Sequence, residues 1–139
     1  IEQIMRQTTI CSSILILLSS NNSNLVHLAG EEVKDVHKLF LRPYWKIFDI
    51  KECDQTLWFN QDSFPEINLD ISKKYIDKIS TSKKSYLFSI NQEACFNNFI
   101  DGYQHPVHEL ISGNKNFKLL NRSRDFLRNG YIEELYKLD

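Results

Sequence analysis

The 139-residue sequence has few small residues and few prolines, with four glycines, three prolines and two alanines. It contains no glycine-rich loop in which backbone N–H groups could approach a phosphate. It also contains no serine with the flanking glycines of a nucleophile elbow. These absences argue against nucleotide binding through a glycine loop and against hydrolases that use such an elbow.

Cysteine is scarce as well. Cys11, Cys53 and Cys95 are odd in number and widely spaced, which excludes a disulfide framework and a paired-cysteine zinc motif. We therefore expect reduced thiols and a cytoplasmic chain. A catalytic role for Cys95 would require His105 or His108 beside it, and we favour a buried, unreactive thiol instead.

Net charge and long apolar runs are also lacking. The formal net charge is −1, which excludes the strongly basic domain typical of nucleic-acid binding. The apolar run over 10–18 is too short to span a bilayer. The same run follows Arg6 and resembles part of a secretory signal, so a targeting role for residues 5–30 stays open as an alternative.

What the sequence does contain is ordinary for a globular protein: 42% of residues are hydrophobic and 25% are charged. The length suits one domain, which we expect to extend over residues 1–139. Its hydrophobic patterns predict a single compact α/β or α+β domain with about four strands and about five helices.

The first half of the chain predicts a buried strand followed by a helix. The strand lies over 14–18, and apolar residues at three- and four-residue spacing predict a helix over 25–40. Aromatic and β-branched residues then favour strands over 44–50 and 56–59, and residues 62–65 predict a turn.

The second half predicts more helix than strand. Asp70 is the expected cap of a helix that reaches Ile79, and the segment over 85–90 alternates as a strand does. A helical stripe over 95–100 ends at Gly102, and Pro106 stands where a short helix would begin. The last helical pattern extends over 123–138.

One cluster suggests a metal-dependent hydrolase. His105, His108 and Glu109 are close in sequence and carry the ligand types of a divalent metal site. The usual zinc motif instead places two histidines four residues apart with a glutamate between them, so the match is incomplete. We keep this enzyme as an alternative and expect no metal and no cofactor.

Acid-x-Lys triplets, which some phosphodiesterases use, occur at Asp49–Lys51 and Glu32–Lys34. The composition alone predicts about 1.5 such triplets by chance, so these two carry no signal.

Charge is unevenly distributed along the chain. Between residues 115 and 128, five basic residues stand against one acid, with aromatic residues among them. Lys and Arg bind phosphates and aromatic rings stack on bases, so Arg122, Arg124 and Arg128 are a second alternative, nucleic-acid binding. The balanced total charge makes a solvated surface the better interpretation.

An acidic, aromatic stretch between residues 46 and 66 has five acids against two lysines. Aromatic side chains supply contact area and carboxylates steer a basic partner, although Trp58 and Phe59 also suit a core. The sequence therefore predicts a small protein-binding module, an inhibitor or immunity-type protein that covers a basic toxin such as a nuclease. The candidate partner-binding residues are Asp49, Glu52, Asp54, Trp58, Phe59 and Asp62.

Overall fold

The computed structural model describes residues 26–28, 32, 39–41, 44–51, 55–93, 97–98 and 102–139. The chain divides into two compact units, residues 1–50 and residues 51–139. The strand predicted over 14–18 lies outside the described residues. The expectation of one domain over the whole chain stays a prediction.

In the first unit, two short strands lie at the two ends of the range over 25–40 that the sequence predicts as a helix. Strand β1 (Val26–Leu28) pairs in parallel with β2 (Leu39–Leu41), with Val26 opposite Leu39. Both strands have an apolar–x–apolar pattern, which fits a helical stripe and a strand equally well over three residues. The helix prediction is wrong at both ends because the pairing joins residues too far apart to appear in a local pattern.

The strand predicted over 44–50 is also wrong. This segment forms a 3₁₀ helix, η2 (Tyr44–Asp49). Pro43 precedes it, and proline is common where a helix begins. Lys46 Nζ lies 2.7 Å from a carboxylate oxygen of Asp49, three residues later, which matches the three-residue turn of this helix type.

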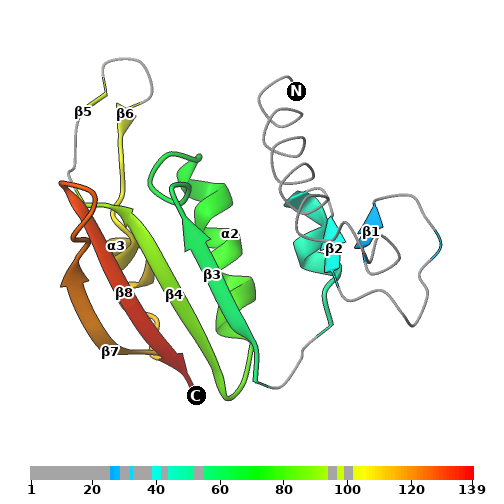
Figure 1. The fold of residues 1–139 in the computed structure, drawn as a ribbon. Helices are drawn as coiled ribbons and strands as arrows, with labels where there is room; N and C mark the ends of the chain where they lie inside the picture. The colour runs from blue at the N-terminus through cyan, green and yellow to red at the C-terminus, as the bar shows by residue number, and fades with distance from the viewer. Residues whose placement is uncertain are drawn as a thin grey trace. The chain divides into compact units, whose positions relative to one another are not determined.

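The second unit is built on one four-stranded mixed sheet with the order β3-β4-β8-β7. Strand β3 (Leu57–Gln61) is parallel to β4 (Ser85–Gln92), whereas β8 (Tyr131–Leu138) is antiparallel both to β4 and to β7 (Phe117–Arg124). The helices α2 (Leu69–Ser80) and α3 (Val107–Ile111) lie on one face of the sheet (Figure 1). The predicted mixed fold class is thereby confirmed for this sheet.

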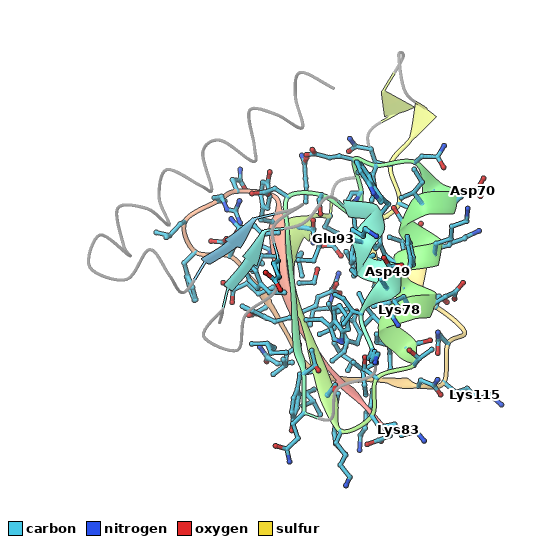
Figure 2. The ribbon with its side chains drawn as sticks, turned by 90° about the vertical axis from the view of Figure 1, so that its right-hand side faces the viewer. Asp49, Asp70, Lys78, Lys83, Glu93 and Lys115 are labelled. Carbon is cyan, nitrogen blue, oxygen red and sulfur yellow. The ribbon has the colours of Figure 1, made fainter. Side chains whose placement is uncertain are left out.

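Helix α2 joins the parallel strands β3 and β4 and confirms the helix that the sequence predicts there. Its cap is Asn68, whose Oδ1 accepts the backbone N–H of Asp70 at 2.9 Å. Asp70, which the sequence analysis assigned as the cap, lies in the first turn and points away from the sheet (Figure 2). A negative charge there is favourable beside the positive end of the helix dipole.

The core lies between the sheet and the two helices. Ile76 and Ile79 of α2 and Val107 and Ile111 of α3 are buried against the sheet. Leu87 of β4 is completely buried in the same cluster. Pro106 immediately precedes α3, so the short helix expected at this proline is confirmed.

Serine side chains fill the helix-facing side of β4 beside Leu87. Ser85 and Ser89 are fully buried, and each has a partner, because a buried hydroxyl without a hydrogen bond is costly. Ser85 Oγ donates to the Lys83 carbonyl at 2.9 Å. Ser89 Oγ accepts from Asn91 Nδ2 at 2.8 Å. Both buried hydroxyls are thereby hydrogen-bonded within the core.

The helix predicted over 123–138 is wrong, because this segment contains the end of β7, a turn and all of β8. Gly130 in the turn has a φ of +83°, which glycine adopts without a steric penalty. Asn129 and Gly130 form the dipeptide most typical of tight hairpin turns, so the signal was present in the sequence. Leu127, Tyr131 and Leu135 share a four-residue spacing that also fits a helix.

A second correction concerns the predicted helix over 95–100. Here Asn97–Asn98 (β5) pairs antiparallel with Gly102–Tyr103 (β6). Cys95, Phe96 and Phe99 lie outside the described residues. The part of the chain that the structure describes contains two α-helices, and the expected total of about five is not supported.

Replacing Leu87 tests where the core lies. Leu87→Ala removes a completely buried side chain and is expected to lower the free energy of unfolding by about 2–5 kcal/mol. The matched change Leu119→Ala, on the exposed surface of β7, should alter it by about 0.5 kcal/mol or less. Urea unfolding of the full chain measures both, and equal losses would contradict the assigned core.

Candidate protein-binding surface

The sheet has a second face, opposite α2 and α3, whose part over β3 and β4 is apolar, whereas Lys137 and Glu133 of β8 lie on the same face opposite Tyr86 and Ile90. Successive side chains of a strand point to opposite faces of the sheet. The residues that alternate with the buried serines along β4 are large and apolar, and they point to this second face. Leu57 and Phe59 of β3 are 63% and 58% exposed, and Tyr86 of β4 is exposed beside them. We call this the apolar face; its members are Leu57, Phe59, Tyr86, Phe88, Ile90 and Leu135.

Strand pairing brings these side chains together in rows. Leu57 stands opposite Tyr86, and Phe59 stands opposite Phe88, which in turn is opposite Leu135. The rings of Phe59 and Phe88 are 5.8 Å apart between centroids, within the range of a favourable aromatic pair. The result is a continuous apolar patch that ends at the outer strand β3.

The predicted partner-binding residues do not share one surface. Phe59 lies on the apolar face, whereas Trp58 points to the helix side, packs against the core and donates its Nε1–H to Ser82 Oγ at 3.0 Å. Asp49 belongs to the other unit and pairs with Lys46. Glu52 and Asp54 lie outside the described residues.

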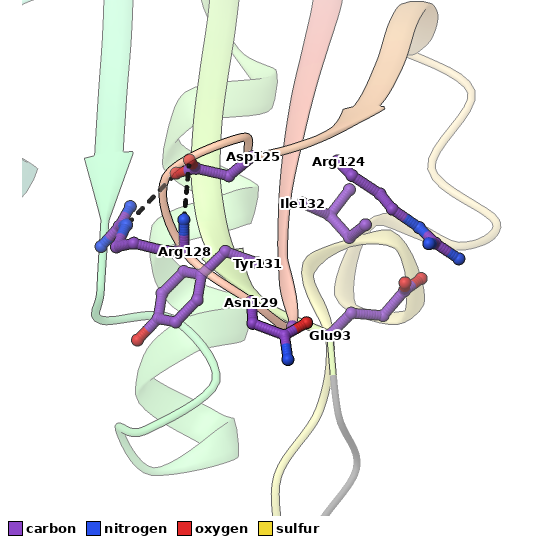
Figure 3. Close-up of a pocket in the computed structure, with 8 residues that line it drawn as sticks. Glu93, Arg124, Asp125, Arg128, Asn129, Tyr131 and Ile132 are labelled. Atoms are coloured by element: carbon purple, nitrogen blue, oxygen red, sulfur yellow. Dashed lines mark hydrogen bonds and ion pairs between the residues drawn. The ribbon is translucent and has the colours of Figure 1, made fainter.

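Asp62 belongs to a cluster of charged residues at the end of β3. Its carboxylate accepts from Arg128 Nη1 at 2.6 Å, across 66 residues of sequence. Arg128 also donates from Nε to Asp125 at 3.2 Å and lies over the ring of Tyr131, with Cζ 4.1 Å from the centroid. Asp125, Arg128 and Tyr131 line a pocket of about 370 Å³. Figure 3 shows the contacts between Asp125 and Arg128, with the Tyr131 ring beside them. The cluster ties the β7–β8 turn to the loop after β3.

The protonation of this cluster follows from its contacts. The pKa of Asp125 is lowered, first because its carboxylate accepts the backbone N–H of Leu127 and then through Arg128. The pKa of Arg128 is raised, mainly by its hydrogen bond to Asp62. Burial raises the pKa of the Tyr131 phenol, and the negative charge of Asp62 adds to that effect. The Arg128 guanidinium is thus held between the side chains of Asp62 and Asp125.

An asparagine pair holds the loop that carries Asp62. Asn91 Nδ2 donates to Asn60 Oδ1 at 2.8 Å, and Asn91 Oδ1 accepts the Ser63 backbone N–H at 3.0 Å. Asp62 itself has a φ of +51°, a conformation that asparagine and aspartate tolerate better than other non-glycine residues. The loop thus connects to β4 through Asn91 and to the β7–β8 turn through Arg128.

The basic stretch over 115–128 is partly neutralised within the fold. Arg122 forms ion pairs with Glu93 and with Glu134, whose carboxylate is buried and lies 3.0 Å from Arg122 Nε. Since Arg128 is paired as well, two of the three arginines considered for nucleic-acid binding already contact carboxylates. Arg124 remains on the exposed surface.

The histidine cluster does not gather three ligands. His105 precedes α3, and its Nδ1 lies 3.4 Å from Glu109 Oε2, whereas His108 is an exposed residue within the helix. Among the described residues, no group of three or more His, Cys, Asp or Glu side chains is arranged to hold a metal ion. Within those same ranges, no helix has both the length and the apolar character required to cross a membrane.

Comparison with known proteins adds no family to this description. No protein-family model matches the sequence, and no curated protein matches it. The geometry of the described residues therefore carries the argument about function. The feature that the sequence analysis missed is the apolar face; its signal is the alternation of serine with Tyr86 and Phe88 along one strand.

The lowered pKa of Asp125 predicts how stability depends on pH. A carboxyl group whose pKa is lower in the folded state than its unfolded value of 3.8 stabilises the fold above that value, and the contribution disappears as the pH falls through the folded pKa. Asp125→Asn should therefore lower the midpoint of urea unfolding at pH 7, and the difference from the original chain should shrink below about pH 4. A difference that stays constant down to pH 2 would contradict the role given to this carboxylate.

Proposed function

We propose that this chain is a small protein-binding module of the inhibitor or immunity type, which covers a basic protein such as a nuclease toxin in the cytoplasm. The observation that carries the proposal is the apolar face, where Leu57 and Phe59 are each more than half exposed. Contiguous exposed apolar patches mark interaction sites on soluble proteins, whereas isolated apolar residues do not.

The chemistry of the partner is inferred from charge. Glu52 and Asp54 precede β3 in the sequence, the strand that carries Phe59, and Lys51 is the one basic residue between Asp49 and β3, whereas Asp49 itself is paired with Lys46. Carboxylates near a contact surface in the sequence can steer a basic partner during association and reject acidic competitors. A basic protein is therefore the occupant that this chain suits best.

The proposed contact is centred on Phe59 rather than on the whole predicted set. Trp58 and Asp62 are assigned structural roles, because Trp58 donates a hydrogen bond to Ser82 and Asp62 accepts one from Arg128. The metal-dependent hydrolase and the nucleic-acid binder are not carried further. His105, His108 and Glu109 do not form a three-ligand cluster, and Arg122 and Arg128 contact carboxylates within the fold.

Exchanging Phe59 for a small polar residue tests the apolar face. The full chain is immobilised, the protein that it captures from an extract of its own cells is purified, and the affinity is measured by calorimetry. Phe59→Ser should weaken binding about tenfold or more, as expected for an aromatic anchor. Phe126→Ser is the matched control, because Phe126 is 99% exposed but lies in the β7–β8 turn, and it should change the affinity by less than about twofold. Equal effects of the two changes would refute the assigned surface.

The acidic residues before β3 predict a separate effect on association. The double change Glu52→Lys and Asp54→Lys should slow the association rate and weaken its dependence on salt, because steering charges act mainly on that rate. The double change Asp70→Lys and Asp77→Lys, at two exposed positions of α2, alters the net charge by the same amount and is the control. Stopped-flow measurements with the captured protein at about 50 and 300 mM NaCl give both quantities. An unchanged rate would contradict the proposed basic partner.

A further inference from the structure

The two outer strands of the sheet differ in a way that bears on assembly. Unpaired strand edges invite pairing with another chain, and proteins block them with charges, prolines or bulges. Strand β7 has such protection: its register shifts between Leu119 and Asn121, and it carries Lys118, Arg122 and Arg124. Strand β3 has neither a bulge nor a charged or proline residue over Leu57–Gln61.

The unprotected edge of β3 has a defined set of free backbone groups. The Thr56 carbonyl accepts from the Tyr86 N–H at 2.9 Å, and the Asp62 N–H donates to the Ile90 carbonyl at 3.2 Å, so the even-numbered residues of this segment face β4. Backbone groups alternate in direction along a strand. The N–H and C=O groups of Leu57, Phe59 and Gln61 therefore point outward, and β3 pairs with no other strand among the described residues.

We propose that a second copy of this chain pairs with this edge, so that two β3 strands run antiparallel about a twofold axis at Phe59. Two identical strands related by a twofold axis must be antiparallel. With Phe59 opposite its own counterpart, Leu57 stands opposite Gln61 of the other copy. In this register the outward N–H and C=O groups of Leu57, Phe59 and Gln61 in one copy face the outward C=O and N–H groups of the other copy. This is the arrangement of hydrogen-bonded pairs in an antiparallel sheet.

Charge favours this edge over the other. A twofold pairing of β3 places no like charges opposite each other, because the five residues carry none. Arg122 is paired with Glu93 and Glu134, but twofold pairing of β7 would still bring Lys118 and Arg124 of each copy onto one short interface, and like charges on facing strands are destabilising. The second copy thus fits β3 and is repelled by β7.

The pairing would also cover exposed apolar area. Side chains that face each other across antiparallel strands lie on the same face of the sheet, so the two Phe59 rings meet on the apolar face and Leu57 gains a neighbour. The two four-stranded sheets become one eight-stranded sheet with a doubled apolar face. The interface is made by the strand edge, so a partner protein can still contact the face, and dimerisation stands or falls independently of the proposed function.

Sedimentation velocity of the full chain from about 1 to 500 µM tests the dimer, since a short-strand interface lies at the small, weak end of the size range. Phe59→Pro removes an outward-pointing N–H group but none of the hydrogen bonds to β4. The matched control is Phe59→Ala, which lacks the ring but keeps the N–H group. Phe59→Pro should weaken dimerisation about tenfold or more relative to this control. Leu119→Lys, on the β7 edge, should leave the dimer intact. A monomer at every concentration, or a dimer lost only in Leu119→Lys, would overturn the proposal.

Amide hydrogen exchange of the unaltered chain gives a second readout that does not depend on how a variant folds. The amides of Leu57, Phe59 and Gln61 should exchange rapidly at low concentration and slowly at high concentration, whereas those of Trp58 and Asn60 should be protected throughout. Protection of the odd-numbered amides that does not change with concentration would equally overturn the proposal.

Discussion

The alternation of side chains along β4 is the constraint on which the rest of the described fold depends. Ser85, Leu87 and Ser89 face the helices and are completely buried there. The same geometry obliges Tyr86 and Phe88 to point the other way. On the helix side, β4 therefore contributes two serines and one leucine to the core. Its aromatic side chains, Tyr86 and Phe88, lie on the opposite face of the sheet. The surface proposed for binding is a direct consequence of how the core is built.

The charged residues of this unit act mainly within the fold. Arg128 holds Asp62 and Asp125 together, and Arg122 compensates the buried carboxylate of Glu134. A buried carboxylate that lost its partner would be strongly destabilising, so these arginines are needed where they are. Positive charge that is already paired attracts nucleic acid weakly. Arg122 and Arg128 therefore belong to the architecture of the β7–β8 hairpin, and the proposal of a protein partner rests on the apolar face.

Local patterns predicted the parts of the fold that depend on local interactions. Strand β4 and helix α2 have clear periodicity, whereas β3 was predicted from its aromatic and β-branched composition alone. The helix prediction over 123–138 is wrong because the apolar spacing of this segment fits a helix as well as a strand. The strand forms because β8 pairs with β4, which is distant in the sequence and leaves no trace in a local pattern. Phe59 was predicted as a contact residue, and strand alternation would have separated it from Trp58. The pair between Asp62 and Arg128 has no local signature.

The central claim is that the apolar face is accessible in the complete chain. Hydroxyl-radical footprinting of the free protein, read by mass spectrometry, measures this directly by comparing two pairs of like residues. Tyr86 should be labelled well before the buried Tyr136, and Phe59 well before the buried Phe64. Protection of Tyr86 and Phe59 to the level of their buried counterparts would show that the face is already covered, and it would contradict the account.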